Sequence, residues 1–144
     1  MAVKPIPEGY RSVTPYLAVE DASALLDFVK KAFDAEEMLN MPTPDGKIGH
    51  AEVRIGDSIV MLADASTSDQ GQAMPAMIHL YVEDADATFK KAIAAGATIL
   101  RELEDQFYGD RSGGVRDPVG NHWWIATHVE DVSPEEMEKR ARER

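Results

Sequence analysis

Histidine, glutamate and aromatic residues recur at a spacing of two along this 144-residue chain. The pairs are His50 with Glu52, His79 with Tyr81, and His122 with Trp124. Because successive side chains of a strand point to opposite faces, both members of a pair share one face if the segment is a strand. An imidazole beside a carboxylate can exchange protons with a substrate or bind a divalent metal ion. Aromatic neighbours would supply the walls of a small-molecule pocket.

Alternating apolar residues predict the strands that carry these pairs. The residues expected to face a helix are, strand by strand, Val13, Leu17 and Val19, then Ala51, Val53 and Ile55, then Ile78, Leu80 and Val82. The opposite faces would line a cup, and its expected members are Tyr16, His50, Glu52, His79, Tyr81, His122 and Trp124. In the last strand each face holds a large aromatic residue, Trp123 or Trp124, so the pattern does not decide which face points into the cup.

The chain contains an internal repeat that predicts its fold. Residues 16–22 match residues 79–85 at an offset of 63. Each copy is a short apolar run followed by an aspartate, Asp21 or Asp84, that can cap the start of a helix. Three further strand patterns, separated by turn residues, follow each predicted helix. The sequence therefore predicts an α+β fold of two βαβββ modules.

Composition shifts along the chain suggest its domain organisation. Module one is expected at about 10–64, a polar linker at 65–75 and module two at about 76–128, all within one domain over 1–132. The remaining segment, 133–144, begins with a capping box and has no apolar stripe. We expect it to form an exposed helical tail.

Charge and composition exclude several classes of partner. Asp and Glu number 26 against 15 Lys and Arg, a formal net charge of −11. Such a chain repels the phosphates of nucleic acid and of an anionic membrane. It contains no cysteine, no apolar stretch approaching the ~20 residues of a membrane span and no apolar leader. We therefore expect a cytoplasmic protein with neither nucleic-acid nor membrane partners.

The repeat and its turns are similar to a known family. Two βαβββ halves, a Val-Glu-Asp-Ala sequence opening each helix, and the turn over 117–121 resemble the vicinal oxygen chelate superfamily. The likeness is strongest to its PhnB-like, glyoxalase/bleomycin-resistance branch and covers about residues 10–132. It implies that the two modules form a cupped mixed sheet around a ligand, usually in a homodimer.

The resemblance also implies four positions for metal ligands, normally His or Glu. In this chain those positions hold Thr14, Val60 or Met61, Met77 and Trp124. None of these side chains is a good ligand for a divalent metal ion. The inherited metal site is therefore expected to be absent, and no cofactor is expected.

A glycine-rich segment over 109–114 is expected to form a loop at the rim of the cup. No helix pattern follows it, which argues against a phosphate-binding loop. Its Arg111 is expected either to pair with Asp110 or Asp117 or to bind an anionic ligand. Together with Tyr108, which precedes the segment, Arg111 completes the expected set of ligand-binding residues.

Two functions are compatible with this pattern. The first is a metal-free, homodimeric small-molecule-binding protein of the bleomycin-resistance type, which holds a compact aromatic or polar ligand. The alternative is an enzyme of the superfamily. It would use either a displaced Zn or Fe site built from His50, Glu52, His79 and His122, or His50 with Glu52 as a metal-free acid–base pair.

Overall fold

The computed structural model describes residues 2–67 and 71–144, and its first half is a βαβββ module. The elements of module one are β1 (Tyr16–Val19), α1 (Ala22–Phe33), β2 (Glu36–Pro42), β3 (Ile48–Ile55) and β4 (Ser58–Asp64). They form one four-stranded sheet in the order β1-β4-β3-β2. β1 and β4 run parallel, and the other neighbours run antiparallel.

The second half repeats this arrangement. The elements of module two are β5 (Met77–Tyr81), α2 (Ala85–Ala94), β6 (Thr98–Asp105), β7 (Asp110–Arg116) and β8 (His122–His128). Their order is β5-β8-β7-β6, again with one parallel pair. A short 3₁₀ turn, η1 (Ala65–Thr67), follows β4, and α3 (Pro134–Arg142) ends the chain. The expected α+β fold of two βαβββ modules is thus confirmed.

Both module helices begin at the predicted caps. The side chain of Asp21 accepts a hydrogen bond from the backbone N–H of Ala24, and Asp84 does the same for Ala87, each at 3.1 Å. These bonds satisfy backbone donors that the first turn of a helix leaves free. Among the described residues no helix has the length and apolar character needed to cross a membrane.

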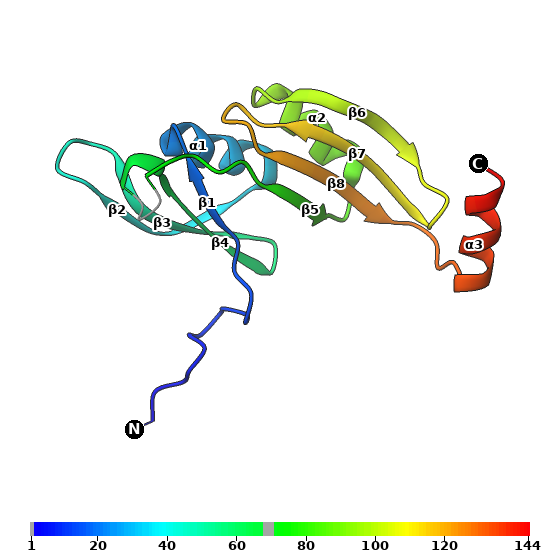
Figure 1. Cartoon of the computed structure of the whole chain (residues 1–144), viewed down its shortest axis with the longest axis horizontal. Helices are drawn as coiled ribbons and strands as arrows, with labels where there is room; N and C mark the ends of the chain where they lie inside the picture. Colours follow the sequence, from blue (N-terminus) through cyan, green and yellow to red (C-terminus); the bar gives the residue numbers. More distant parts are fainter. Residues whose placement is uncertain (1, 68–70) are drawn as a thin grey trace.

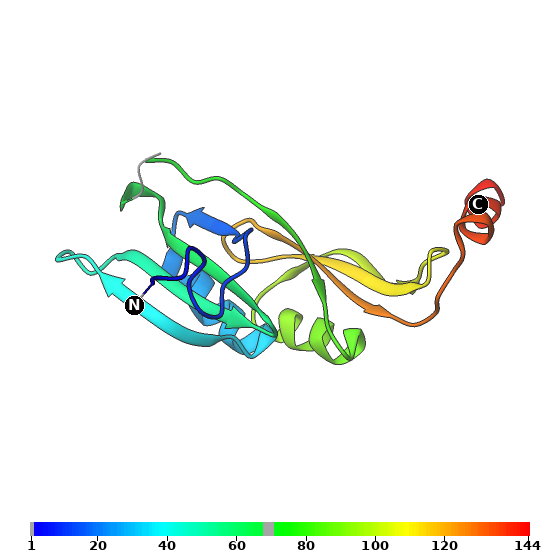
Figure 2. The ribbon, with the colours of Figure 1, turned by 90° about the horizontal axis from the view of Figure 1, so that it is seen from below.

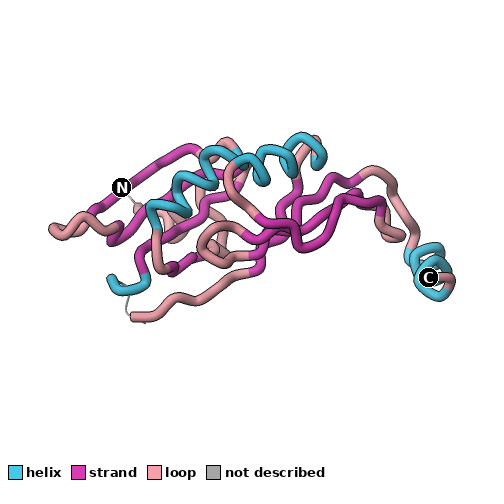
Figure 3. Tube along the Cα trace, turned by 90° about the horizontal axis from the view of Figure 1, so that it is seen from above, coloured by secondary structure: helices cyan, strands magenta, loops and turns pink. Residues whose placement is uncertain are grey.

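One hydrophobic core runs through both modules. α1 and α2 pack against one face of the sheets and against each other (Figure 3). At the junction, the rings of Phe33 in α1 and Trp123 in β8 have centroids 4.7 Å apart. Lys91 of α2 also pairs with Asp34, the residue after α1, at 2.7 Å. Every strand except β2 therefore contributes a side chain to this core.

The side of each sheet opposite its helix is called here the open face. The two sheets lie one after the other along the molecule and remain separate four-stranded sheets (Figure 1). Over module one the N-terminal segment passes on the side away from α1 (Figure 2). Large apolar side chains remain exposed on these open faces, among them Tyr16 at 47% and Met77 at 68%.

Two sequence predictions about elements were wrong. The first strand begins at Tyr16, so Val13 lies outside it and is 84% exposed instead of packing on a helix. The segment over 109–114, expected as a rim loop, lies largely in β7. Its Gly113 and Gly114 serve close packing, because a Cβ on either would lie within 3.0 Å of the neighbouring Phe89 or Trp124 ring.

Candidate functional site

The open face of module two holds a pocket of about 310 Å³ around Trp124. It is lined by Met77, His79, Arg101, Tyr108, Ser112 and Trp124. The lining comes from all four strands of the sheet and from the loop before β7. A concave site with aromatic walls and a few polar groups is the usual form of a small-molecule site.

Alternation along β8 places Trp124 in this pocket. Trp123 is fully buried on the helix face, where its Nε1–H donates to the Asp117 carboxylate at 2.8 Å. Trp124 therefore projects from the open face, which answers the question that the sequence left open. Its ring lies against β7, since a Cβ on Gly114 would come within 2.5 Å of it. Only a glycine at position 114 leaves room for this ring.

Arg101 is a pocket residue that sequence reasoning missed. Its guanidinium carbon lies 5.1 Å from the centroid of the Trp124 ring, within cation–π range. Its Nη2 donates to the Ser112 carbonyl oxygen at 2.8 Å and to the Ser112 Oγ at 2.6 Å. β6 has register shifts on both sides of Arg101, so simple alternation does not predict its direction. The sequence did offer one indication, because Arg101 is the only basic residue of β6, whose other charged residues are acidic.

A second group of polar side chains lies on the open face of module one. The His50 Nε2 and Glu52 Oε2 atoms are 2.7 Å apart, and the Tyr16 hydroxyl lies 3.2 Å from the His50 Nδ1. The Tyr10 hydroxyl, from the N-terminal segment, donates to the Glu52 carboxylate. Sequence reasoning grouped Tyr16, His50 and Glu52 but missed Tyr10, which precedes every strand.

These contacts select one tautomer of the neutral His50 ring. Because the Glu52 carboxylate only accepts hydrogen bonds, the proton lies on His50 Nε2. The Nδ1 lone pair then accepts from the Tyr16 hydroxyl. The arrangement is an oriented imidazole on the open side of the sheet, and its Nδ1 can meet another molecule once the Tyr16 hydroxyl moves away.

Tyr81 and His128 meet at a buried carboxylate at the end of module two. The Tyr81 hydroxyl donates to Asp110 at 2.7 Å, and this bond, followed by burial, raises the pKa of Tyr81. His128 contacts Asp110 through Nδ1 at 2.8 Å and Asp131 through Nε2 at 2.7 Å. The hydrogen bond with Asp110, followed by that with Asp131, raises the pKa of His128. Tyr81 is thus oriented by Asp110 and lies outside the Trp124 pocket, although its ring contacts His79.

Arg111 lies on the opposite face from the pocket. It pairs with Asp86 of α2 at 2.8 Å and with Asp105 of β6 at 3.3 Å. The prediction that Arg111 pairs with Asp110 or Asp117 was therefore wrong. Arg111 lies within β7 and not in a loop at the rim of a cup. Within β7, alternation directs Arg111 toward α2 while Ser112 faces the pocket. The Arg111 guanidinium lowers the pKa of the Asp86 carboxyl.

The four residues of the alternative metal site lie on different sheets. His50 and Glu52 are on β3 of module one, whereas His79 and His122 are on β5 and β8 of module two. Among residues 2–67 and 71–144 no three His, Asp or Glu side chains are grouped as metal ligands. His122 shares the open face with Trp124 by alternation but does not line its pocket.

The residues at the inherited metal positions do not fit a divalent ion. Thr14 precedes β1, and Val60 is buried in the core, which leaves Met61 as the open-face residue of β4. Met77 and Trp124 occupy the corresponding positions of module two. Thioether and indole groups are poor ligands for Zn, Mn or Fe, so the donor chemistry of these positions is unsuitable.

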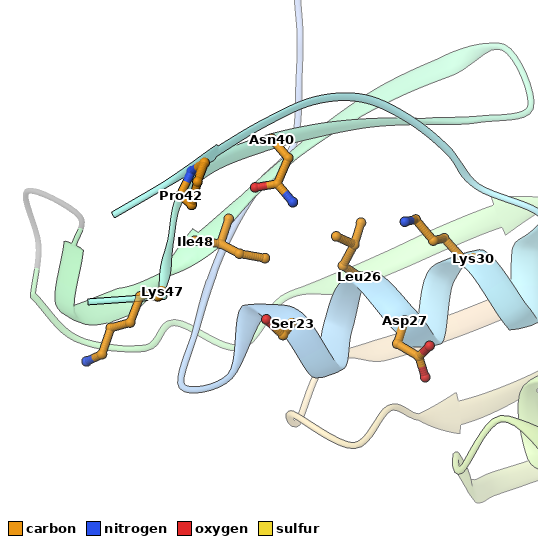
Figure 4. A pocket seen from close by; sticks show the side chains of 9 residues that line it. Ser23, Leu26, Asp27, Lys30, Asn40, Pro42, Lys47 and Ile48 are labelled. Carbon is orange, nitrogen blue, oxygen red and sulfur yellow. The ribbon is translucent and has the colours of Figure 1, made fainter. Parts of the chain in front are cut away.

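Two other hollows lack the combination of aromatic walls with an arginine or lysine that forms no ion pair among the described residues. One, of about 340 Å³, lies between α1 and β2 and is lined by Ser23, Leu26, Lys30, Asn40 and Pro42, among others (Figure 4). It contains no aromatic or imidazole side chain. The other is a wide hollow of about 1300 Å³ between the modules. Its lining includes Phe33, His79, Tyr81 and His128, and its lysine, Lys91, is paired with Asp34. The Trp124 pocket combines aromatic walls with an unpaired cation and is the candidate site.

Comparison with known families agrees with this architecture. A family model described as the Glyoxalase/Bleomycin resistance protein/Dioxygenase superfamily matches residues 11–125. An uncharacterized protein of Mycobacterium bovis, Mb0911c, is 43% identical over 136 residues, which cover 88% of this chain and 90% of that protein.

Solved structures show the same fold. The crystal structure of TioX from Micromonospora sp. ML1 has a TM-score of 0.71 and 29% identity, with 83% of this chain and 99% of that chain covered. A PhnB protein from Bacillus cereus has a TM-score of 0.66 at 20% identity, covering 81% of this chain and 99% of its own. At that identity the PhnB likeness concerns the fold alone.

Proposed function

The chain belongs to the Glyoxalase/Bleomycin resistance protein/Dioxygenase superfamily, and we propose that within it the chain is a metal-free small-molecule-binding protein. Its ligand is a compact aromatic or polar molecule held at the Trp124 pocket. One observation carries the proposal: Trp124 occupies a position where the family resemblance implies a metal ligand, and it forms the wall of a pocket. The site has thus exchanged a metal-binding group for an aromatic surface.

The pocket has the dimensions and composition for such a ligand. Its volume of about 310 Å³ accommodates a single ring system with a small polar substituent. Trp124 and Tyr108 offer aromatic surface, Met77 offers an adaptable thioether, and Arg101 and Ser112 offer hydrogen-bonding groups. His79 adds a further polar edge.

Fluorescence titration tests this proposal. Nitroaromatic compounds quench tryptophan, so 4-nitrobenzamide and 4-nitrobenzoate are suitable probes of this pocket. We expect at least one of them to quench the protein saturably, with EDTA making no difference. Quenching should persist in Trp123→Phe, which keeps the pocket residue, and should be lost in Trp124→Phe.

Elemental analysis supplies the complementary result. Stoichiometric Zn, Mn, Ni or Fe in the purified protein, whose removal abolishes binding or a measurable turnover, would overturn the proposal. Equal quenching in Trp124→Phe and the wild type would also overturn it, because binding would then lie elsewhere.

The Tyr16–His50–Glu52 contacts favour a second candidate, a metal-free proton-transfer enzyme. In this case the Tyr16 hydroxyl moves away from His50 Nδ1, which then removes a proton from a carbon next to a carbonyl group. The electrons of the C–H bond form an enolate, and Glu52 stabilises the imidazolium. The test is exchange of carbon-bound hydrogen of dihydroxyacetone in deuterium oxide, followed by NMR with EDTA present. Exchange above the buffer rate, lost in His50→Gln but kept in His122→Gln, would support catalysis. Equal rates with and without protein would exclude it for this substrate class.

A further inference from the structure

The Trp124 pocket contains a cation that has no acidic partner. Among the residues that the structure describes, Arg101 forms no ion pair, whereas the neighbouring Arg111 forms two. Arg101 is also the basic residue that lines this pocket. The guanidinium of Arg101 is instead fixed by a backbone carbonyl and a hydroxyl group, both from Ser112. Neither of these acceptors neutralises its charge.

Two buried donors in this pocket also lack acceptors. In the described part of the chain, the Arg101 Nε and Trp124 Nε1 atoms are the buried side-chain polar atoms without a hydrogen-bond partner. Buried donors in native proteins are almost always paired, and an unpaired donor marks a place where an acceptor is missing. Both side chains line the same pocket. Because both atoms are buried, an acceptor that enters the pocket reaches them only when the side chains of the lining move.

The strand neighbours hold Arg101 and Trp124 in place. Arg101 pairs with Gly114 in the β6–β7 register, and Gly114 pairs with Trp124 in the β7–β8 register. The three residues therefore form one row across the sheet, with the indole lying against the glycine and the guanidinium over the indole ring. This row places the N–H donors of the guanidinium directly at the indole ring.

From this arrangement we infer that the ligand is a planar molecule bearing a carboxylate or similar anionic group. This inference rests on the proposed function and names its ligand class. The planar part lies on Trp124, and the anionic oxygens bind Arg101, whose planar fork suits a carboxylate. The net charge of −11 repels an anion from the molecule as a whole, so such a ligand depends on this single guanidinium.

Two isosteric probes test the inference. 4-Nitrobenzoate and 4-nitrobenzamide have nearly the same shape, and only the first is an anion at neutral pH. We expect the wild type to bind the benzoate at least about tenfold more tightly, because hydrogen bonds between charged groups are stronger than neutral ones. Arg101→Gln should remove this preference by weakening the benzoate and leaving the amide within about twofold, as expected when one charge-assisted contact is lost.

Matched variants distinguish a specific contact from a general charge effect. Arg116→Gln removes the same charge from β7 without altering the pocket lining, and it should retain the wild-type preference. Arg101→Lys keeps the charge but loses the fork, and its preference should fall between those of the wild type and Arg101→Gln. Thermal melts show which variants are folded, and the wild-type comparison of the two probes requires no variant at all.

Each outcome decides between the proposals. Equal affinity of the wild type for both probes, or an unchanged preference in folded Arg101→Gln, overturns the anionic ligand and leaves small-molecule binding at Trp124 standing. Failure of both probes to bind the wild type at low-millimolar concentration overturns both. Preference for the benzoate that disappears equally in Arg101→Gln and Arg116→Gln shows general electrostatic attraction, and this also contradicts the inference.

Discussion

Trp123 and Trp124 are adjacent in the sequence, and the strand directs them to opposite sides of the sheet. Trp123 closes the core between the modules and donates its Nε1–H to Asp117. Trp124 lies on the open face with an Nε1–H that has no partner among the described residues. The same residue type thus serves folding at one position and, in our proposal, ligand binding at the next.

The Asp117 carboxylate gives a prediction about stability. It is 3% exposed and accepts hydrogen bonds from the Val119 and Asn121 N–H groups, the Asn121 side chain and Trp123. Asp117→Ala should lower the free energy of unfolding by about 3 kcal/mol or more, since several buried donors lose their acceptor. Urea denaturation measures the difference.

A matched aspartate provides the control. The Asp57 side chain is 86% exposed, lies 4.0 Å from Arg11 and accepts a hydrogen bond from the exposed Ser58 hydroxyl at 3.1 Å. Asp57→Ala should change the free energy of unfolding by less than about 0.5 kcal/mol. A loss below about 1 kcal/mol in Asp117→Ala would contradict the role assigned to its hydrogen bonds.

His128 gives a prediction about pH. Its pKa is raised in the folded protein, first by Asp110 and then by Asp131, so the protonated form is stabilised by folding. This contribution is fully present below the unfolded pKa of about 6.5 and is lost as the pH rises through the higher folded value. The free energy of unfolding of the wild type should therefore exceed that of His128→Gln by a larger amount at about pH 6 than at about pH 8.5. The first pH lies near the ordinary histidine pKa of about 6.5, and the second lies well above it.

Urea denaturation of both proteins across this pH range measures the effect. The partners Asp110 and Asp131 remain in both proteins, so the difference reports on the imidazole itself. A difference that is constant, or that grows as the pH rises, would show that the protonated ring does not stabilise the fold.

At the residue scale the sequence predicted part of the candidate site. Alternation placed His50, Glu52 and His79 on open faces because β3 and β5 are regular strands. It missed Arg101, which lies between two irregularities of β6, and Tyr10, which approaches Glu52 from outside the sheet. These contacts depend on local irregularity and tertiary packing, which a two-residue period does not encode.

Among the elements, β7 shows most clearly how close packing determines composition. Gly113 faces α2, where a Cβ would lie 2.9 Å from the Phe89 ring, and Gly114 faces Trp124. The two glycines look like a loop signal in the sequence, and this caused the wrong prediction of a rim loop. The strand tolerates them because large rings from α2 and β8 occupy the space of the missing side chains.

Alanine substitutions separate these two glycines. Gly114→Ala should displace the Trp124 ring and weaken 4-nitrobenzoate binding by about tenfold or more, since stacking and the Arg101 contact both depend on the ring position. Gly113→Ala should lower stability by about 1–3 kcal/mol, because its Cβ would lie 2.9 Å from the Phe89 ring and 3.0 Å from the backbone of Arg101 and Leu103. Its loss of affinity should be smaller than that of Gly114→Ala, since it does not touch the Trp124 ring. Titration and urea denaturation provide the two readouts, and equal losses of affinity would contradict the assignment of faces.

The order of the elements was more predictable than their ends. Capping by Asp21 and Asp84, both confirmed, follows from local hydrogen bonding that any helix start requires. The start of the first strand was misplaced because Val13 and Thr14 continue the apolar alternation but precede Pro15. Strand pairing with β4 begins only at Tyr16, so Val13 has no sheet neighbour to pack on.

For the whole molecule, the notable feature is that both open faces expose apolar side chains. Leu39 and Met41 of β2 lie beside Glu52 and His50 in the register of module one, and Met77 is exposed in module two. Exposed apolar surfaces of this kind are typical of sites that bind other molecules. We propose that a second copy of the chain covers them in a homodimer.

Light scattering after size-exclusion chromatography tests this assembly. The wild type should elute with the mass of two chains, and Met41→Asp should elute with the mass of one because a charge is placed on the open face of β2. Met74→Asp is the matched control, since Met74 is 56% exposed against 55% for Met41 but lies outside the sheets. A wild type with the mass of one chain at every concentration would contradict the dimer.

The measurement that tests the central claim most directly is an NMR titration of the tryptophan side chains in metal-depleted protein. The ¹H–¹⁵N spectrum contains two indole signals, one from Trp123, whose N–H is bound to Asp117, and one from Trp124. Addition of 4-nitrobenzoate should shift the Trp124 signal progressively to saturation and leave the Trp123 signal nearly unchanged. A Trp124 signal that does not move, or that moves only after a divalent metal ion is restored, would contradict a metal-free ligand site on this face.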